Sequence, residues 1–401
     1  MICNRSTPNS LLRHCLIRVN SGYMRLALRL ARRGHGTTSP NPMVGAVLVN
    51  GGKIIGQGWH HRAGEPHAEI LAIHDAAKRG NRVKGSTLYV TLEPCSTQGR
   101  TPPCTDTIIR TGIKRVIIGA TDPNPGHRGK AYGILKHAGV NVVIGILANE
   151  CEELNEAFNH WIVHRTPFVT VKAAMTLDGK IAAASGESKW ISGESARTYG
   201  MELRRGADAI LVGINTILAD DPWLTARSPK SKAQSARSRK AHKLRRIILD
   251  SQARTPLNAN VVSDDYADLT TIFVGRAAPL KQVSALSKRV NVIIAPGRSP
   301  SKIDLRWLLQ RLGSENVTSL LVEGGGEVNA SFLLEKLAQR VVFFYAPKIL
   351  GGRDSVRAVA GKGVLGLKDA VRLTNPEYRK IGADLLLTAR LDADTAGSSD
   401  T

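Results

Sequence analysis

Hydrophobic residues recur along residues 44–146 in short runs whose spacing alternates between that of a strand and that of a helix. Apolar-rich runs at 44–49 and 53–58 flank Asn50-Gly51-Gly52, which favours a β-hairpin. Residues 67–79 have apolar positions at helical spacing and end before Gly80. The other predicted elements are strands at 87–92, 115–120 and 140–146 and helices at 104–110 and 132–137. This alternation predicts a three-layer α/β domain with a mixed sheet.

A second pattern of the same kind follows Thr166-Pro167, which marks a domain boundary after a helix predicted at 150–164. The strands predicted beyond it are 168–173, 209–212, 246–249, 271–274, 290–294, 319–322 and 341–345. Between the last two, Gly324-Gly325-Gly326 opens a helix predicted at 328–337. We therefore predict two α/β domains, one at 21–164 and one at 165–391.

The composition is that of an ordinary globular protein, with 42% hydrophobic and 22% charged residues. A chain of 401 residues can form two domains, each with its own core. Because no apolar run approaches the ~18 residues of a membrane span, we expect no membrane association. Five cysteines are too few and odd in number for a disulfide framework, which favours a reducing, cytoplasmic location.

The net charge of +23 is concentrated in two stretches, 1–64 and 228–246, which carry 17 of the excess positive charges. The first includes a short helical pattern at 23–33, and the second predicts a basic loop insertion at 228–244. A solvated surface explains both, and weak attraction to RNA or another polyanion is the alternative. Aromatic residues make up only 4% of the chain, so a nucleic-acid partner is not expected.

Both ends of the chain are predicted to be disordered, at 1–20 and at 392–401. The first segment bears arginine and no acid, as an organellar transit peptide does. It lacks the sustained apolar core of a secretory signal. A translation start after Met1 is the alternative explanation for this segment.

Three residues with the chemistry of zinc ligands lie where helices are predicted to begin or strands to end. His67 opens one predicted helix, Cys95 follows a predicted strand, and Cys104 opens another helix. One imidazole and two thiolates leave the fourth position of Zn²⁺ open for water. Glu69, two residues after the histidine, can carry a proton from that water to a leaving amine. This pattern is typical of zinc-dependent nucleobase deaminases.

Two other interpretations of these ligands stay open at this point. A closed structural zinc site needs a fourth protein ligand, and Cys151 is the spare cysteine nearest in the sequence. A tRNA or nucleotide deaminase fits the basic charge, but it predicts a Cys-x-x-Cys spacing and no cofactor-binding second domain. Eight residues separate the two cysteines of this chain.

The second half contains a glycine-rich turn, Glu323 to Glu327, between a predicted strand and a predicted helix. Such a backbone permits close approach of a pyrophosphate to a helix N-terminus. The pattern is not Gly-x-Gly-x-x-Gly, so a Rossmann dinucleotide site is weakly indicated. A turn with no ligand is the alternative.

Longer segments surround these motifs and strengthen their interpretation. In the first half they are Gly64–Glu69, Thr91–Ser96, Gly99–Cys104 and Asp122–Pro125. In the second half they are Lys172–Lys180, Ser188–Ile191 and Gly213–Pro222. Together they resemble the bifunctional riboflavin-biosynthesis deaminase–reductase family over roughly residues 22–390. The resemblance implies a cytidine-deaminase-like three-layer domain followed by a dihydrofolate-reductase-like domain.

For the first domain, the resemblance implies hydrolytic deamination of 2,5-diamino-6-ribosylamino-4(3H)-pyrimidinone 5′-phosphate. His67, Cys95 and Cys104 would bind Zn²⁺, and Glu69 would carry the proton. Asn41, in Ser39-Pro40-Asn41-Pro42, would read an edge of the pyrimidine with its amide donor and acceptor. A proline-constrained turn is the alternative for that segment.

For the second domain, the resemblance implies NADPH-dependent reduction of the ribosyl group of 5-amino-6-(5-phosphoribosylamino)uracil to ribityl. The residues that would contact NADPH are Ala174, Trp190, Thr216, Asp220, Ser251, Gly325, Gly326, Glu327, Val328, Asn329, Ala330 and Ser331. The residues that would hold the sugar-phosphate substrate are Ser188, Arg204, Leu224, Arg227 and Glu323. A surface ion pair is the alternative for Arg204, and Lys172 and Asp220 are the candidate acid–base residues.

One departure from the family stands between the two cysteines. Many relatives carry two histidines where this chain has Thr97-Gln98, so a substrate contact by those histidines does not transfer. The expected partner is a small-molecule substrate, and we expect a homo-oligomer.

Overall fold

The structure, a computed structural model, describes residues 21–98, 102–226, 244–297, 299–300 and 302–392. The predicted extension at 1–20, most of the basic insertion at 228–244 and all but Asp392 of the predicted tail lie outside these ranges. The chain divides after His164 into two compact units. In the part that the structure describes, no helix combines the length and apolar character needed to cross a membrane.

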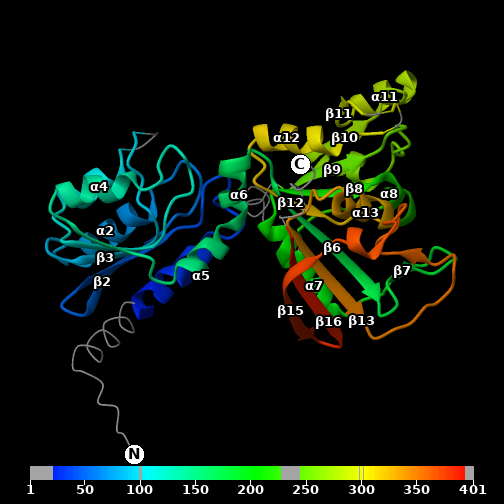
Figure 1. Ribbon diagram of the computed structural model, residues 1–401. Coiled ribbons are helices and arrows are strands. Elements are labelled where there is room, and N and C mark those ends of the chain that lie inside the picture. The colour runs from blue at the N-terminus through cyan, green and yellow to red at the C-terminus, as the bar shows by residue number, and fades with distance from the viewer. Residues whose placement is uncertain (1–20, 99–101, 227–243, 298, 301, 393–401) are drawn as a thin grey trace, which may run out of the picture. The chain divides into compact units, whose positions relative to one another are not determined.

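The first unit contains a five-stranded mixed sheet in the order β2-β1-β3-β4-β5 (Figure 1). Its strands are β1 (Gly45–Asn50), β2 (Lys53–Trp59), β3 (Thr87–Leu92), β4 (Arg115–Ala120) and β5 (Asn141–Ile144). β1 pairs antiparallel with β2 and β3, whereas β3, β4 and β5 are parallel. The parallel strands therefore end at a common edge, where the segments that follow β3 and β4 come together.

Helices cover both faces of this sheet. One face packs against α2 (Ala68–Lys78), α3 (Cys104–Arg110) and α4 (Lys130–His137). The other packs against a helix at 21–31 and α5 (Ala148–Leu154), with Met24 and Cys151 fully buried between them and the strands. These layers confirm the three-layer α/β domain predicted from the pattern.

The single helix predicted at 150–164 is wrong in one respect, because it is two helices. α5 ends at Leu154 and α6 (Glu156–His164) begins after Asn155, which is 4% exposed. The Asn155 side chain accepts a hydrogen bond from Met43 N at 2.8 Å and donates one to Met43 O at 2.9 Å. The break between the helices is therefore made by a contact with residue 43. The apolar residues of 150–164 keep helical spacing across the break, so the sequence pattern does not show it.

The second unit contains a nine-stranded sheet in the order β11-β10-β9-β8-β12-β6-β13-β16-β15 (Figure 1). Its strands are β6 (Phe168–Thr176), β8 (Ala209–Gly213), β9 (Arg245–Leu249), β10 (Thr270–Val274), β11 (Asn291–Ile294), β12 (Ser319–Val322), β13 (Arg340–Ala346), β15 (Leu373–Ile381) and β16 (Asp384–Leu391). The strands from β11 to β13 are parallel, and β16 and β15 join antiparallel. β7 (Lys180–Ala182) and β14 (Val356–Arg357) form a separate pair.

Helices pack on both faces of the parallel part of this sheet. α12 (Leu305–Ser314) and α13 (Gly326–Leu334) pack on one face. α7 (Glu194–Gly206), α8 (Ile214–Asp220), α10 (Asn260–Ser263) and α11 (Leu280–Ser287) pack on the other. Val341 and Val342, adjacent in β13, accordingly belong to cores on opposite faces.

The hairpin β15–β16 was not among the strands predicted from the sequence. All the side chains of β15 except that of Ile381 are exposed, so this strand shows no alternation of apolar and polar positions. Asp384, at the start of β16, is 2% exposed and accepts a hydrogen bond from Gly193 N at 2.7 Å. Contacts of this kind lie too far apart in the sequence to be recognised there.

Two glycines allow α2 to lie directly on β2. A Cβ atom at Gly56 would be 2.3 Å from Ala72 O, and one at Gly58 would be 2.5 Å from Ala68 O. The facing side of α2 consists of Ala68, Ala72 and Ala76, all fully buried. Small residues on both elements therefore bring the helix and strand backbones into direct contact, from Ala68 at the start of α2 onward.

Gly58→Ala is expected to lower the free energy of unfolding of the first unit by about 1–3 kcal/mol, because the new methyl group overlaps the α2 backbone. Urea unfolding followed by circular dichroism measures this. The matched control is Gly133→Ala in α4, where a Cβ meets no atom within 4 Å. That change should be neutral or stabilise by up to about 1 kcal/mol. Equal effects of the two substitutions would contradict the packing argument.

Candidate active sites

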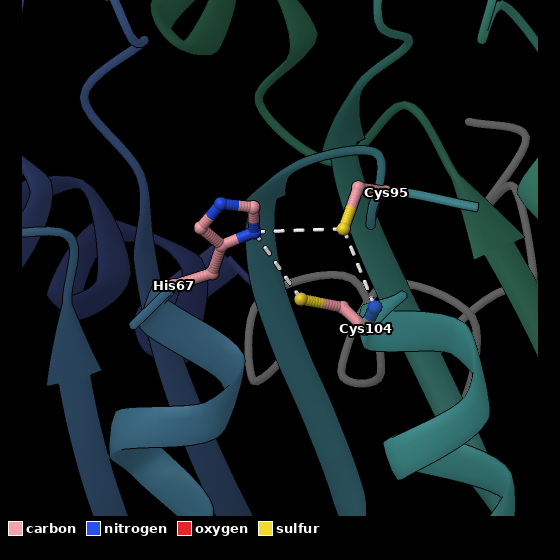
Figure 2. A group of neighbouring side chains, drawn as sticks. All are labelled: His67, Cys95 and Cys104. Carbon is pink, nitrogen blue, oxygen red and sulfur yellow. Dashed lines mark hydrogen bonds between the residues drawn. The ribbon is translucent and has the colours of Figure 1, made fainter. Parts of the chain in front are cut away.

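The three zinc ligands predicted from the sequence meet at the edge where β3 and β4 end. His67 occupies the position before the first residue of α2, Cys95 follows β3 by three residues, and Cys104 is the first residue of α3. Figure 2 shows the three side chains turned toward one another from these separate segments. In the part of the chain that the structure describes, this is the one group of three or more His, Cys, Asp or Glu with metal-binding geometry.

The distances fit a tetrahedral zinc ion. His67 Nδ1 lies 3.5 Å from Cys95 Sγ and 3.4 Å from Cys104 Sγ, and all three ligand atoms are within 4.8 Å of one another. Zinc bonds of about 2.0–2.3 Å to nitrogen and sulfur place ligands roughly 3.5–3.8 Å apart in a tetrahedron. The Cys104 N–H also donates to Cys95 Sγ at 3.3 Å, so the two cysteine segments are in contact.

Hydrogen bonds and burial shift the pKa values of all three groups. Hydrogen bonds with Cys104 and His67 lower the pKa of the Cys95 thiol to about 4, against the effect of burial. The hydrogen bond to Cys95 raises the pKa of His67 to about 9, and the hydrogen bond with Cys95 together with burial raises the pKa of Cys104. Zinc must displace the protons of His67 and Cys104, so its affinity falls as the pH falls.

Cys151 is not a fourth ligand. It is buried on α5, where a Cβ added to Gly119 of β4 would lie 2.3 Å from Cys151 Sγ. Burial raises the pKa of its thiol to about 12, as expected for an inert core cysteine. The protein ligands therefore number three within the described residues, which agrees with a catalytic site and not with a closed structural one.

Glu69 lies in the first turn of α2 and is only 2% exposed. Its Oε2 atom has no hydrogen-bond partner among the described residues. Burial raises the pKa of this carboxyl above its ordinary value, more than His67 lowers it. A buried carboxyl that binds a proton readily and keeps one oxygen free is suited to general acid–base work.

A cavity of about 310 Å³ opens beside the ligands. His67, Glu69 and Cys95 line it, together with side chains from five further stretches of the first unit. Those side chains are Pro40, Asn41, Pro42, Val44, His60, Leu92, Glu93, Asp122, Asn124, His127, Phe158, Trp161 and Ile162. Asn41, named from the sequence, is therefore at this cavity.

His60, which sequence reasoning missed, fixes the orientation of Asn41. His60 Nδ1 lies 3.2 Å from Pro66 O, a partner that can only accept, so Nδ1 carries the proton. Its Nε2 then accepts from Asn41 Nδ2 at 3.1 Å. Burial lowers the pKa of His60, which keeps the ring neutral. The Asn41 amide oxygen is left to accept from a ligand. The sequence offered one indication that His60 belongs to the site, namely its position directly after the strand β2.

The departure at Thr97-Gln98 also has a counterpart in the structure. Thr97 Oγ1 lies 3.4 Å from both ring nitrogens of His127, and His127 lines the cavity. An imidazole thus stands beside Thr97, although it comes from a loop 30 residues further along the chain. The sequence alone gives no indication of this contact.

In the second unit, the predicted site residues follow the carboxyl ends of parallel strands. Thr216 and Asp220 are in α8 after β8, Ser251 follows β9, and Glu323 to Gly326 follow β12. Glu323 N donates to Leu211 O of β8, and a Cβ at Gly213 would be 2.8 Å from Val328 Cγ2. These contacts bring the ends of β8 and β12 and the start of α13 together, the usual place for a ligand on such a sheet.

Arg204 and Glu323 form a bidentate buried ion pair. Arg204 Nε and Nη2 donate to the Glu323 carboxylate at 2.8 and 2.9 Å, and Nη1 donates to Thr225 O at 3.1 Å. Lys172 Nζ lies 3.5 Å from Glu323 Oε2. Burial alone would raise the pKa of Glu323, but Arg204 and Lys172 outweigh it and hold that pKa at about 2. The surface-pair alternative for Arg204 is wrong, since its side chain is 16% exposed.

The other reductase residues named from the sequence differ in accessibility. Trp190 is 65% exposed and stacks under the Arg197 guanidinium, and Ser188 donates to Asp220 at 2.9 Å. Leu224 is 2% exposed, and Asn329 is fully buried and donates to Ala358 O. Ala330 is also buried, whereas Ala174, Thr216, Ser251, Gly325, Val328 and Ser331 are half-buried and Glu327 is exposed. Arg227 lies outside the described residues.

The glycine turn fits a dinucleotide phosphate. Gly325 precedes α13 with an extended backbone and no side chain caps the helix. A Cβ at Gly325 would meet no atom within 4 Å, so there is open space in front of this helix N-terminus. Free backbone N–H groups and the helix dipole at such a position favour a phosphate group.

Family models match both units of the chain. A model of the cytidine and deoxycytidylate deaminase zinc-binding region matches residues 18–120, and a model of the RibD C-terminal domain matches residues 167–387. The two matches confirm the predicted fold classes, a cytidine-deaminase-like first domain and a dihydrofolate-reductase-like second domain.

Whole-length relatives extend this result. The riboflavin biosynthesis protein RibD of Aquifex aeolicus is 42% identical over 92% of this chain and 98% of its own length. The Escherichia coli RibD protein is 38% identical over 91% of this chain and 97% of its own length.

Solved structures are similar to this chain over nearly its whole length. Acinetobacter baumannii RibD has a TM-score of 0.80 and 32% identity over 94% of this chain and 99% of that chain. A Thermotoga maritima protein described as a diaminohydroxyphosphoribosylaminopyrimidine deaminase/5-amino-6-(5-phosphoribosylamino)uracil reductase has a TM-score of 0.78 and 34% identity, with the same coverage. The resemblance recognised in the sequence is thereby confirmed: this chain belongs to the RibD family of bifunctional riboflavin-biosynthesis deaminase–reductases.

Proposed function

We propose that the first unit deaminates 2,5-diamino-6-ribosylamino-4(3H)-pyrimidinone 5′-phosphate and that the second reduces the ribosyl group of the product to ribityl. The observation that carries this proposal is the meeting of His67, Cys95 and Cys104 beside a cavity that Glu69 also lines, with one Glu69 oxygen left without a hydrogen-bond partner among the described residues. The deaminase and reductase activities in the description of the Thermotoga maritima relative support both steps. The order follows, because the reductase substrate is the uracil that deamination forms.

Zn²⁺, when bound by His67, Cys95 and Cys104, would act as a Lewis acid that lowers the pKa of a water molecule to about 7. Glu69 accepts a proton from the attacking water and donates it to the departing nitrogen. The overall step consumes one water and releases one ammonia, and Glu69 ends in its starting state. Its raised pKa, caused by burial, matches a group that must both accept and donate a proton.

Asn41 and His60 bind the pyrimidinone ring of the substrate. Because neutral His60 holds the Asn41 amide nitrogen, the amide oxygen is directed to accept from an exocyclic amine or ring N–H of the pyrimidinone. Asn124 and Asp122 offer further polar groups in the same cavity. A diaminopyrimidinone is rich in donors, so a wall of oxygen acceptors suits it.

In the second unit, NADPH supplies the hydride for the reduction. Lys172 holds a proton at Nζ within 3.5 Å of Glu323, and it is the residue we assign to protonate the reduced sugar. Arg204 fixes the Glu323 carboxylate, which then accepts from ribose hydroxyls. We assign Thr216, Ser251 and the turn at Gly325 to NADPH, because they follow neighbouring parallel strands.

We also infer that the chain forms a homo-oligomer and acts in the cytoplasm. Large apolar side chains exposed on the second unit support association, among them Ile349, Leu365, Leu367 and Tyr378. Use of two cysteines as metal ligands supports a reducing compartment. Sedimentation equilibrium that showed only monomers at micromolar concentration would contradict the first inference. Fractionation of cells tests the second.

Glu69→Gln is expected to lower kcat for deamination by at least about a thousandfold, because the amide cannot transfer the proton. Ammonia release from the diaminopyrimidinone phosphate measures this. Oxidation of NADPH with supplied 5-amino-6-(5-phosphoribosylamino)uracil should remain within about twofold of the wild type.

Metal removal is the control for this variant. Dialysis against a chelator should abolish deamination, and zinc should restore it to the wild type but not to Glu69→Gln. The reductase rate should not respond to either treatment. A variant that deaminates normally would contradict the role of Glu69 in proton transfer. A chelator that stops both reactions would contradict separate sites.

Glu323→Gln is expected to destabilise the second unit by about 3 kcal/mol at neutral pH, because Arg204 and Lys172 lose their buried partner. Since the folded pKa of Glu323 lies below its ordinary value, its stabilising effect is complete above pH 4.5 and is lost as the pH falls toward 2. The variant should therefore show a flatter loss of stability across that range. Urea unfolding at several pH values measures it.

The matched control is Glu335→Gln, which changes an exposed carboxylate just after α13. It should leave the stability and its pH dependence unchanged. If Glu323→Gln behaved like this control, the ion pair would not stabilise the unit.

A further inference from the structure

Glu93 is a buried carboxylate to which the mechanism above gives no part. It follows the last residue of β3, precedes Pro94-Cys95 and is 5% exposed. It also lines the cavity that contains Glu69. A buried carboxylate has a high desolvation cost unless its oxygens are hydrogen-bonded, so its partners indicate what it does.

The partners of Glu93 are three backbone N–H groups, two in the loop between β4 and α4 and one in the first turn of α4. Its Oε2 accepts from Asp122 N at 3.2 Å and from Gly129 N at 3.0 Å, and its Oε1 accepts from Ala131 N at 3.1 Å. Its own N–H donates to Ala120 O at 2.9 Å. Both ends of the loop are therefore attached to this one side chain.

The interior of the loop has mainly local hydrogen bonds. Asn124 N donates to Asp122 Oδ1, Gly126 N to Asn124 Oδ1, and the N–H groups of His127 and Arg128 to Asn124 O. These turns shape the loop but do not place it against the sheet. The bonds to Glu93 join it to the strand that leads to the zinc ligand Cys95.

Glu93 also completes the start of α4. Gly129, the residue before the helix, has φ +76° and no side chain of its own segment caps the helix. The Glu93 carboxylate accepts from the N–H of Ala131 in the first turn and places a negative charge at the positive end of the helix dipole. A neutral side chain of the same size would lack the charge and one acceptor.

The loop carries part of the cavity wall. Asp122, Asn124 and His127 all line it, beside His67 and Cys95. We propose that Glu93 is a positioning residue for deamination: its carboxylate holds the 121–131 loop so that Asn124 and its neighbours meet the pyrimidine substrate. This inference rests on the proposed deaminase function of the first unit.

Direct proton transfer by Glu93 does not fit the geometry. Its two oxygens already accept from three N–H groups, whereas Glu69 Oε2 has no partner among the described residues. Glu93 acts through the loop, so its removal should affect substrate binding more than zinc binding.

Glu93→Gln tests the proposal on the full-length, zinc-loaded chain. The KM for the diaminopyrimidinone phosphate should rise about tenfold, with kcat changed less than threefold. Zinc should remain at one ion per chain, and reduction of supplied uracil substrate should be unchanged. Hydrogen exchange of the 122–131 amides should accelerate at least tenfold, while α2 stays protected. The matched control, Glu153→Gln at an exposed position of α5, should change none of these.

A double-mutant cycle separates positioning from general destabilisation. Asn124→Ala should raise KM in the wild type, but it should have little further effect in Glu93→Gln, because the loop is already misplaced. Additive effects of the two changes would overturn the proposal. So would an unchanged KM, loss of zinc or unaltered hydrogen exchange in Glu93→Gln. Failure of the wild type itself to deaminate would instead contradict the proposed function, and the exchange result would still decide whether Glu93 holds the loop.

Discussion

Both sites depend on the same constraint: parallel strands end at one edge of a sheet, so the segments that follow them are brought together. In the first unit this edge unites Cys95 after β3 with the 121–131 loop after β4. In the second it unites α8, Ser251 and the glycine turn before α13. Residues far apart in the chain thereby reach hydrogen-bond distance without any long excursion of the backbone.

The two units place buried carboxylates in opposite electrostatic surroundings. Glu69 has a raised pKa because burial dominates, whereas Glu323 has a lowered pKa because two cations outweigh burial. The first therefore binds a proton more readily than an ordinary carboxyl, and the second stays ionised at neutral pH. The same side chain serves proton transfer in one unit and fixed charge in the other.

Local signals in the sequence were enough for the zinc centre and for most of the parallel strands. The three ligands occupy the starts and ends of elements whose periodicity is clear, and their chemistry is restricted to few metals. His60, Glu93 and His127 could not be identified in that way, because each acts through a contact with a distant segment. The pairing of Arg204 with Glu323, 119 residues apart, is of the same kind.

The two errors in the predicted elements have different origins. Residues 150–164 keep helical spacing through the break at Asn155, since the break is made by a contact with Met43. β15 is exposed along nearly its whole length, so no pattern of burial marks it. The backbone at Asn155 is thus determined by a partner far away in the sequence, whereas β15 pairs with the next strand, β16, and is missed because of its exposure.

The break at Asn155 also decides how the two catalytic halves can be separated. α6 begins directly after it, and Phe158, Trp161 and Ile162 of α6 line the deaminase cavity. A deaminase fragment that stopped at the end of α5 would lack this wall, although it would keep every zinc ligand and Glu69. An independently expressed first half must therefore extend to His164, the residue after which the chain divides.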